Sequence, residues 1–112
     1  MASALASRLD SIKKQAGIKS RDVARLLDTT PETVSRWRKG RAEPQPNRLQ
    51  RLLTLEWLVT ELSEFYSPEE AKLWLFSRHR LLGGETPEKR IHDGKLDDVL
   101  GIIEQLKTGA YV

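Results

Sequence analysis

The sequence predicts an all-α protein with an N-terminal pair of helices, a long connecting helix and a small helical C-terminal half. Apolar residues recur at helical spacing along most of the 112 residues, and helix-starting pairs such as Thr30-Pro31 and Ser67-Pro68 stand where these patterns begin. No segment calls for a β-sheet. The length suits one domain, or two small ones that share a core.

The first helix is expected over residues 3–16. Its apolar side chains repeat at i, i+4, i+7 and i+11, which places them on one face, and Gly17 ends the pattern. Ile18 should add a further core contact. The residues of this face are Leu5, Leu9, Ile12 and Ala16.

Residues 20–40 are predicted to form two short helices joined by a tight turn. Ser20 is expected to cap the first helix. The turn formers Asp-Thr-Thr follow at 28–30 and interrupt the apolar pattern. The inward face of the first helix is Val23, Ala24 and Leu27.

The second helix of this pair is predicted to begin at Thr30, an N-cap, with Pro31 in its first position, where a missing N–H costs nothing. Val34 and Trp37 lie at i and i+3, so both can pack back onto the first helix. Gly40 stands where a left-handed C-cap is expected. These features together are typical of a helix-turn-helix module.

The outward surface of the second helix carries hydrogen-bonding and cationic groups, which can read base edges and hold phosphates in a major groove. The alternative is an ordinary pair of helices with a solvated charged face, and Asp28 stands where such turns often have glycine. We favour DNA binding because cap, turn, small crossing residue Ala24 and basic face coincide. The candidate DNA-binding residues are Thr30, Glu32, Thr33, Ser35, Arg36, Arg38, Lys39 and Arg41.

A stiff connector and a long helix are expected next. Pro44 and Pro46 rule out a regular helix over residues 41–46. The long helix should run from about Asn47 to Phe65, and it is apolar over so wide an arc that it must contact two surfaces. One is the helix-turn-helix core, and the other is the C-terminal half or a second copy of the chain. The residues expected to fill these sides are Leu49, Leu52, Leu53, Glu56, Trp57, Val59, Leu62 and Phe65.

Three further helices are predicted in the C-terminal half. Ser67 with Glu70 forms a capping box, and the helix that follows should end near Ser77. A leucine-containing connector over 80–84 leads to a short helix from Thr86-Pro87, and a last helix is stopped by Gly109. The inward residues are Ala71, Trp74 and Leu75, then Ile91, then Leu96, Val99, Leu100, Ile103 and Leu106.

Charge is divided unevenly along the chain. Residues 1–56 carry 12 Lys and Arg against 6 Asp and Glu, a net +6, whereas residues 57–112 carry 7 against 10, a net −3. The basic half suits a polyanion, and the acidic half should meet something else. There is no cysteine, no secretory signal and no apolar run long enough to cross a bilayer, so we expect a cytoplasmic protein without a membrane partner.

No constellation of residues predicts catalysis or a cofactor. His79 and His92 lack the spacing of metal ligands, and Ser77 has no acid placed by spacing to complete a hydrolytic site. Gly83-Gly84 lacks the strand of a phosphate loop and predicts a turn. Trp57 and Trp74 are interpreted as core anchors rather than base-stacking platforms. We therefore expect no enzyme activity, no metal site, no cofactor and no small-molecule substrate.

Residues 74–112 resemble the toxin-binding domain of Xre/MbcA/ParS antitoxins. In that family a Trp-containing helix leads to a leucine connector, a Pro opens a short helix, a Gly breaks it, and the last helix ends in Gly and an aromatic residue. The helix-turn-helix and long helix also match, and the chain is most similar to the short MbcA-type members. The matching positions are Trp74, Leu81, Leu82, Pro87, Gly94, Val99, Gly109 and Tyr111.

The resemblance implies an antitoxin that binds a cognate RES-domain toxin, an enzyme that degrades NAD, and places its C-terminal end in the toxin's active site. It divides the chain into a DNA-binding module at 1–46, a connecting helix at 47–66 and a toxin-binding domain at 67–112. A short aromatic tail after a rigid helix can fill a pocket at little entropic cost, whereas the alternative is a frayed end or a small core patch. The expected toxin contacts are Arg78, Arg80, Leu81, Leu82, Lys107, Thr108, Gly109, Ala110, Tyr111 and Val112.

The same resemblance implies that the helix-turn-helix binds the operator of the antitoxin's own operon. We expect a homodimer, because one helix-turn-helix contacts few bases and paired half-sites are the usual remedy. Two alternatives stay open: a stand-alone transcriptional regulator whose C-terminal half dimerises or binds another partner, and a polar-localisation or scaffold protein, as among ParS-type relatives.

Overall fold

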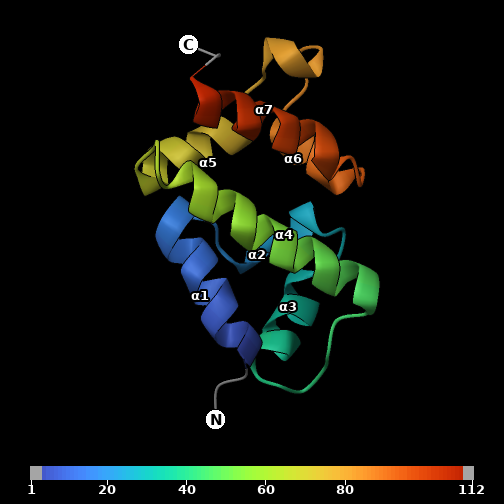
Figure 1. The fold of residues 1–112 in the computed structure, drawn as a ribbon. Coiled ribbons are helices and arrows are strands. Elements are labelled where there is room, and N and C mark those ends of the chain that lie inside the picture. The colour runs from blue at the N-terminus through green and yellow to red at the C-terminus, as the bar shows by residue number, and fades with distance from the viewer. Residues whose placement is uncertain (1–3, 110–112) are drawn as a thin grey trace.

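The computed structural model describes residues 4–109, and in this range every regular element is helical (Figure 1). Its Cα atoms span 44 × 24 × 19 Å. The elements are α1 (Ala4–Ala16), α2 (Ser20–Leu26), α3 (Pro31–Arg38), α4 (Pro46–Leu62), α5 (Pro68–Phe76), the 3₁₀ turn η1 (Arg80–Leu82), α6 (Pro87–His92) and α7 (Leu96–Thr108). The all-α prediction is confirmed.

Helices α1 to α4 enclose the N-terminal part of the core. Helix α1 packs against α3 and α4, while α2 packs against α3. Val34 and Trp37 are buried, and Ala24, only 2% exposed, lies on the inward face of α2. The periodicity of the sequence therefore identified the inward faces of α2 and α3.

The turn between α2 and α3 is tight although it lacks glycine. Asp28 adopts a left-handed conformation with φ of 55°, which aspartate tolerates better than most residues. The amide of Thr29 donates to the carbonyl of Ala24 at 2.9 Å, and the Nη2 of Arg48 donates to the carbonyl of Asp28 at 2.8 Å. Helix α4 thus holds the turn from outside.

Of the two N-caps predicted here, one is confirmed and one is wrong. The Thr30 side chain accepts a hydrogen bond from the amide of Thr33 at 3.1 Å, and Pro31 is the first residue of α3. Ser20 does not cap α2, because it is already the first helical residue. Asp22 takes that role by accepting from the amide of Lys19 at 3.2 Å.

Helix α4 is shorter than expected, and only part of its predicted apolar arc is buried: Leu52, Val59 and Leu62 lie in the core as expected. It ends at Leu62, so Phe65 lies in the turn that follows and is 42% exposed. The sequence prediction missed Leu55 and Leu58, which are fully buried, and it was wrong about Trp57, which is 41% exposed rather than a core anchor. When a helix is apolar on most sides, the periodicity of its sequence does not show which side is buried. In α4 the contacts with α1 and α7 determine the buried side.

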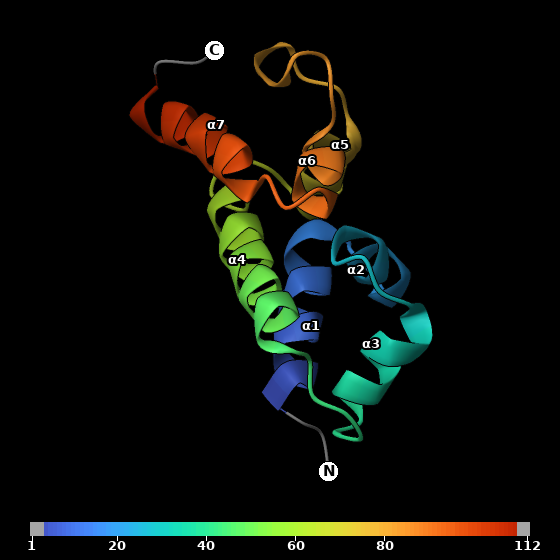
Figure 2. The ribbon, with the colours of Figure 1, turned by 90° about the vertical axis from the view of Figure 1, so that its right-hand side faces the viewer.

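The C-terminal half covers one end of α4 (Figure 2). The capping box at α5 is confirmed: the Ser67 hydroxyl accepts from the amide of Glu70 at 3.2 Å, and the Glu70 carboxylate accepts from the amide of Ser67 at 2.9 Å. Thr86 caps α6 with one hydrogen bond, which its hydroxyl accepts from the amide of Lys89 at 3.1 Å. The predicted inward residues Ala71, Trp74, Leu75, Ile91, Val99 and Ile103 are buried, and Ile102 joins them.

One continuous apolar core connects the two halves. The cluster runs from Leu9 and Trp37 in the first half to Trp74 and Val99 in the second. Helix α5 also packs on α1, and α6 packs on α2. The helix-turn-helix and the C-terminal half are therefore held as one body.

Candidate binding surfaces

Helix α3 is anchored on one side and open on the other. Val34 and Trp37 fix it to the core, so the residues between them are turned outward. Glu32, Arg36 and Lys39 are exposed, while Thr33 and Ser35 are partly exposed. A shallow hollow of about 470 Å³ is lined by Pro31, Glu32, Ser35, Arg36, Lys39 and Arg41. The structure thus brings most of the predicted DNA-binding residues onto one surface.

Three of the predicted DNA-binding residues are engaged within the protein. The hydroxyls of Thr30 and Thr33 lie 2.9 Å apart, so the pair that caps α3 also orients Thr33. Arg38 donates through Nη1 to the Asp10 carboxylate at 2.6 Å, which ties the end of α3 to α1. A phosphate contact by Arg38 would have to share or displace this ion pair.

The connector after α5 presents the second surface. Arg78, Arg80 and Leu81 are exposed, and Leu81 shows 46% of its surface. Leu82 is only 2% exposed and belongs to the core, so the structure does not bring this predicted toxin contact to the surface. The short η1 turn puts two successive leucines in opposite environments, one outward and one inward.

The end of α7 supplies the rest of this second surface. Lys107, Thr108 and Gly109 are exposed, and Gly109 ends the helix in a left-handed conformation. The ammonium of Lys107 lies 3.6 Å from the Glu61 carboxylate on α4. The predicted contacts at residues 110–112, Ala110, Tyr111 and Val112, lie outside the described residues.

Arg90 on α6 fastens the η1 connector and was missed by the sequence analysis. Its guanidinium donates to the carbonyl of Leu82 at 2.8 Å, to Glu85 at 2.6 Å and to Asp98 at 2.5 Å. The carboxylates of Glu85, the larger cause, and Asp98 raise the pKa of Arg90 above its ordinary value. The acceptors lie in η1, in the loop after it and in α7. No regular spacing in the sequence links these segments to Arg90, so the hydrogen bonds could not be predicted from it.

The two histidines have structural contacts. The Nε2 of His79 lies 2.9 Å from the carbonyl of Trp74, and the two rings are 4.8 Å apart. His92 lies 3.4 Å from the carboxylate of Asp28 and 3.2 Å from that of Asp93. Across residues 4–109, no group of three His, Cys, Asp or Glu side chains is arranged to hold a metal ion.

The two surfaces lie at opposite ends of the molecule. Figures 1 and 2 both show α3 and the connector to α4 at one end, with η1 and α7 at the other.

No helix in the described part of the chain is long and apolar enough to span a membrane.

Comparison with known proteins shows similarity along almost the whole chain. The pattern of a helix-turn-helix family matches residues 9–55. The mycobacterial cidal antitoxin MbcA of Mycobacterium tuberculosis H37Rv is 32% identical over 108 residues, which cover 96% of each chain. The probable mycobacterial cidal antitoxin Rv3188 of the same organism is 33% identical over 107 residues, covering 96% of this chain and 91% of that one.

A solved structure agrees with the similarity in sequence. A chain in the crystal structure of the M. tuberculosis MbcT–MbcA toxin–antitoxin complex superposes with a TM-score of 0.83 at 31% identity. The match covers 98% of this chain and 99% of that chain. It therefore includes both halves of the molecule and the way they are packed together.

Proposed function

The chain belongs to the MbcA family of antitoxins, and from this premise we propose that it neutralises a cognate RES-domain toxin that degrades NAD. The observation that carries the proposal is the match over 98% of this chain to a chain of a toxin–antitoxin complex. In this proposal the C-terminal end of the antitoxin enters the toxin's active site and excludes NAD. The antitoxin itself catalyses no reaction and binds no small-molecule substrate.

The arrangement of the C-terminal half supports this mode of inhibition. Helix α7 is fixed by buried Val99, Ile102 and Ile103, so it is a rigid base for the residues that follow Gly109. A segment that starts from a rigid base loses less conformational entropy on binding than a free peptide does. Exposed Arg78, Arg80 and Leu81 provide further contacts around the rim of the cleft.

The helix-turn-helix supports a second part of the proposal, in which the antitoxin binds the operator of its own operon. Thr33, Ser35 and Arg36 face outward from α3 and would read bases or nearby phosphates. The cations Arg38, Lys39 and Arg41 would neutralise phosphates. A homodimer would place two copies of α3 on paired half-sites about one helical turn apart.

Truncation of the C-terminal end tests the proposal. Deletion of residues 110–112 should abolish rescue of growth beside the toxin, while binding to the promoter region of the operon stays unchanged in a gel-shift assay. The matched control is Arg36→Ala, which should weaken DNA binding and leave the rescue intact. A truncated protein that still restores growth and still blocks NAD consumption would refute the plug mechanism.

A further inference from the structure

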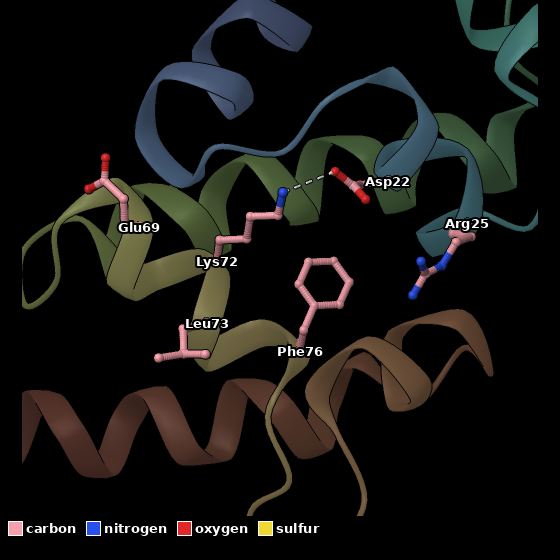
Figure 3. Close-up of a pocket in the computed structure, with 6 residues that line it drawn as sticks. All are labelled: Asp22, Arg25, Glu69, Lys72, Leu73 and Phe76. Atoms are coloured by element: carbon pink, nitrogen blue, oxygen red, sulfur yellow. Dashed lines mark ion pairs between the residues drawn. The ribbon is translucent and has the colours of Figure 1, made fainter.

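A groove between α2 and α5 lies outside both proposed binding surfaces. Its volume is about 500 Å³, and Figure 3 shows the six side chains that line it. The apolar part is formed by Leu73 and Phe76, and the charged rim by Asp22, Arg25, Glu69 and Lys72. No residue of α3, η1 or α7 contributes to it.

Leu73 forms a ridge beside this groove. It is 68% exposed, the highest value among the large apolar side chains that the structure describes. On its other side lies a second hollow of about 260 Å³, which Leu73 lines together with Tyr66 and Trp74. An apolar ridge flanked by two hollows is the surface that one helix offers to another in ridges-into-grooves packing.

The charged side chains of the groove are arranged so that its two ends carry opposite charges. Figure 3 shows Glu69 at one end and Arg25 at the other, with the ion pair between Lys72 and Asp22 between them, 3.8 Å long. The guanidinium of Arg25 lies 5.5 Å from the centre of the Phe76 ring and also pairs with Glu88. The Arg25 side chain is still 59% exposed, so the outer edge of its guanidinium can donate to a second carboxylate.

We propose that this groove is the surface through which two copies of the chain associate, with their α5 helices antiparallel across a two-fold axis. A surface that is negative at one end and positive at the other complements a copy of itself only when that copy is turned around. Leu73 of each copy then fills the hollow beside Phe76 of the other, and Glu69 faces the second copy's Arg25. This inference rests on the homodimer proposed above, and it leaves α3 and the η1 connector uncovered.

Measurement of mass in solution tests the apolar part of the contact. The full chain should show twice its mass of 12.8 kDa by light scattering and sedimentation. Leu73→Asp should weaken the association at least about thirtyfold, because it places a charge at the centre of the contact. Leu53→Asp is the matched control, since Leu53 is 38% exposed on α4, and it should stay dimeric. Circular dichroism and the melting temperature show that both variants are folded.

Mixing two charge variants tests the orientation. Glu69→Arg and Arg25→Glu should each weaken self-association about tenfold, because each homodimer then holds two repulsive pairs. An equimolar mixture should form heterodimers, since every Glu69–Arg25 position then again joins opposite charges. The weaker association of each variant alone, followed by recovery in the mixture, requires Glu69 of one copy to face Arg25 of the other. If like residues faced each other, each variant alone would associate as well as the wild type, and that result would overturn the antiparallel orientation.

The outcomes separate this inference from the proposed function. A dimeric wild type whose Leu73→Asp variant is also dimeric overturns the assignment of the surface, as does loss of the dimer in Leu53→Asp alone. Loss of toxin binding by a Leu73→Asp variant that stays dimeric overturns it too, because the groove then holds the toxin. A monomeric wild type that still rescues growth overturns the homodimer and this surface but leaves toxin neutralisation standing.

Discussion

The two ends of this molecule are built by different means. At the α3 end, short-range features create the surface: Thr30 and Pro31 start the helix, and Val34 and Trp37 fix its back to the core. At the η1 end, Arg90 gathers acceptors from three separate segments to hold the connector in place. Local sequence therefore defines the proposed DNA surface, whereas long-range contacts define the proposed toxin surface.

This difference is also one of chemistry. The α3 end presents Arg36, Lys39 and Arg41, whose charges suit a polyanion of regular shape. The η1 end presents Leu81 next to the exposed Arg78 and Arg80, a mixed surface that suits a protein partner. If the two ends work independently, a substitution at one end should leave the function of the other unchanged.

The largest expected effect is at the α3 end. Arg36→Ala should cost about 1–3 kcal/mol in operator binding and relax specificity at one base position. Arg36 is exposed, so the fold and toxin binding should be unaffected. Titrations against operator variants measure both effects, with Arg80→Ala as the control cation from the opposite end. Equal losses on all DNA sequences would make Arg36 a plain phosphate contact.

A smaller effect is expected at the η1 end. Arg90→Ala should weaken toxin binding about tenfold, or about 1.4 kcal/mol. The connector that carries Leu81 then loses the hydrogen bonds from Arg90 that hold it in place. DNA binding should not change. Arg90→Lys should recover little, since one ammonium cannot replace a planar donor with three bonded partners.

The matched control for Arg90 is its neighbour Lys89. The ammonium of this residue lies 2.7 Å from the carboxylate of Asp93, and among residues 4–109 it forms no hydrogen bond or ion pair with η1. Lys89→Ala should therefore bind toxin as the wild type does in a calorimetric titration. Normal toxin binding by Arg90→Ala would show that the connector does not need its fastening.

The smallest effect concerns the core that both ends share. Ser67→Ala should lower the free energy of unfolding by about 1 kcal/mol, because α5 loses its N-cap. One core connects the two halves. Unfolding in urea should therefore remain a single transition, with the same midpoint in the N-terminal and the C-terminal half. Two separate transitions, followed by Trp37 and Trp74 fluorescence, would show that the halves are independent.

The same capping box predicts a dependence on pH. Hydrogen bonds from Ser67, first from its backbone amide, lower the pKa of Glu70 from 4.5. The ionised form is the one that the fold favours, so its stabilisation is present above pH 4.5 and is lost as the pH falls through the lowered pKa. The difference in stability between wild type and Glu70→Gln should shrink as the pH falls from 7 to 3.

The sequence predicted most of the fold because most of its signals are local. Caps at Thr30 and Ser67 and the periodicity of five helices place the elements, since each needs only neighbours within one or two turns. The buried arc of α4 was not predictable, because a helix apolar on many sides takes its inward face from its neighbours. Trp57 is exposed for this reason.

The candidate sites also contain residues that the sequence could predict and residues that it could not. The residues of α3 were predictable, because a cap, a turn and two buried anchors determine which side faces out. Leu81 and Leu82 were not distinguishable, since a three-residue turn has no periodicity and the carbonyl of Leu82 is held by a distant arginine. Arg90 escaped notice because its partners lie five and eight residues away along the chain and in different elements.

The most direct test of independent ends is to offer both partners at once. Purified antitoxin, its toxin and a labelled promoter fragment are combined, and the mass of the DNA-bound species is measured by native mass spectrometry. Since the two surfaces lie at opposite ends, toxin should add to the DNA complex without releasing the DNA, and the affinity for each partner should be the same with or without the other. Release of DNA on addition of a toxin that binds the antitoxin would show that the two ends are coupled.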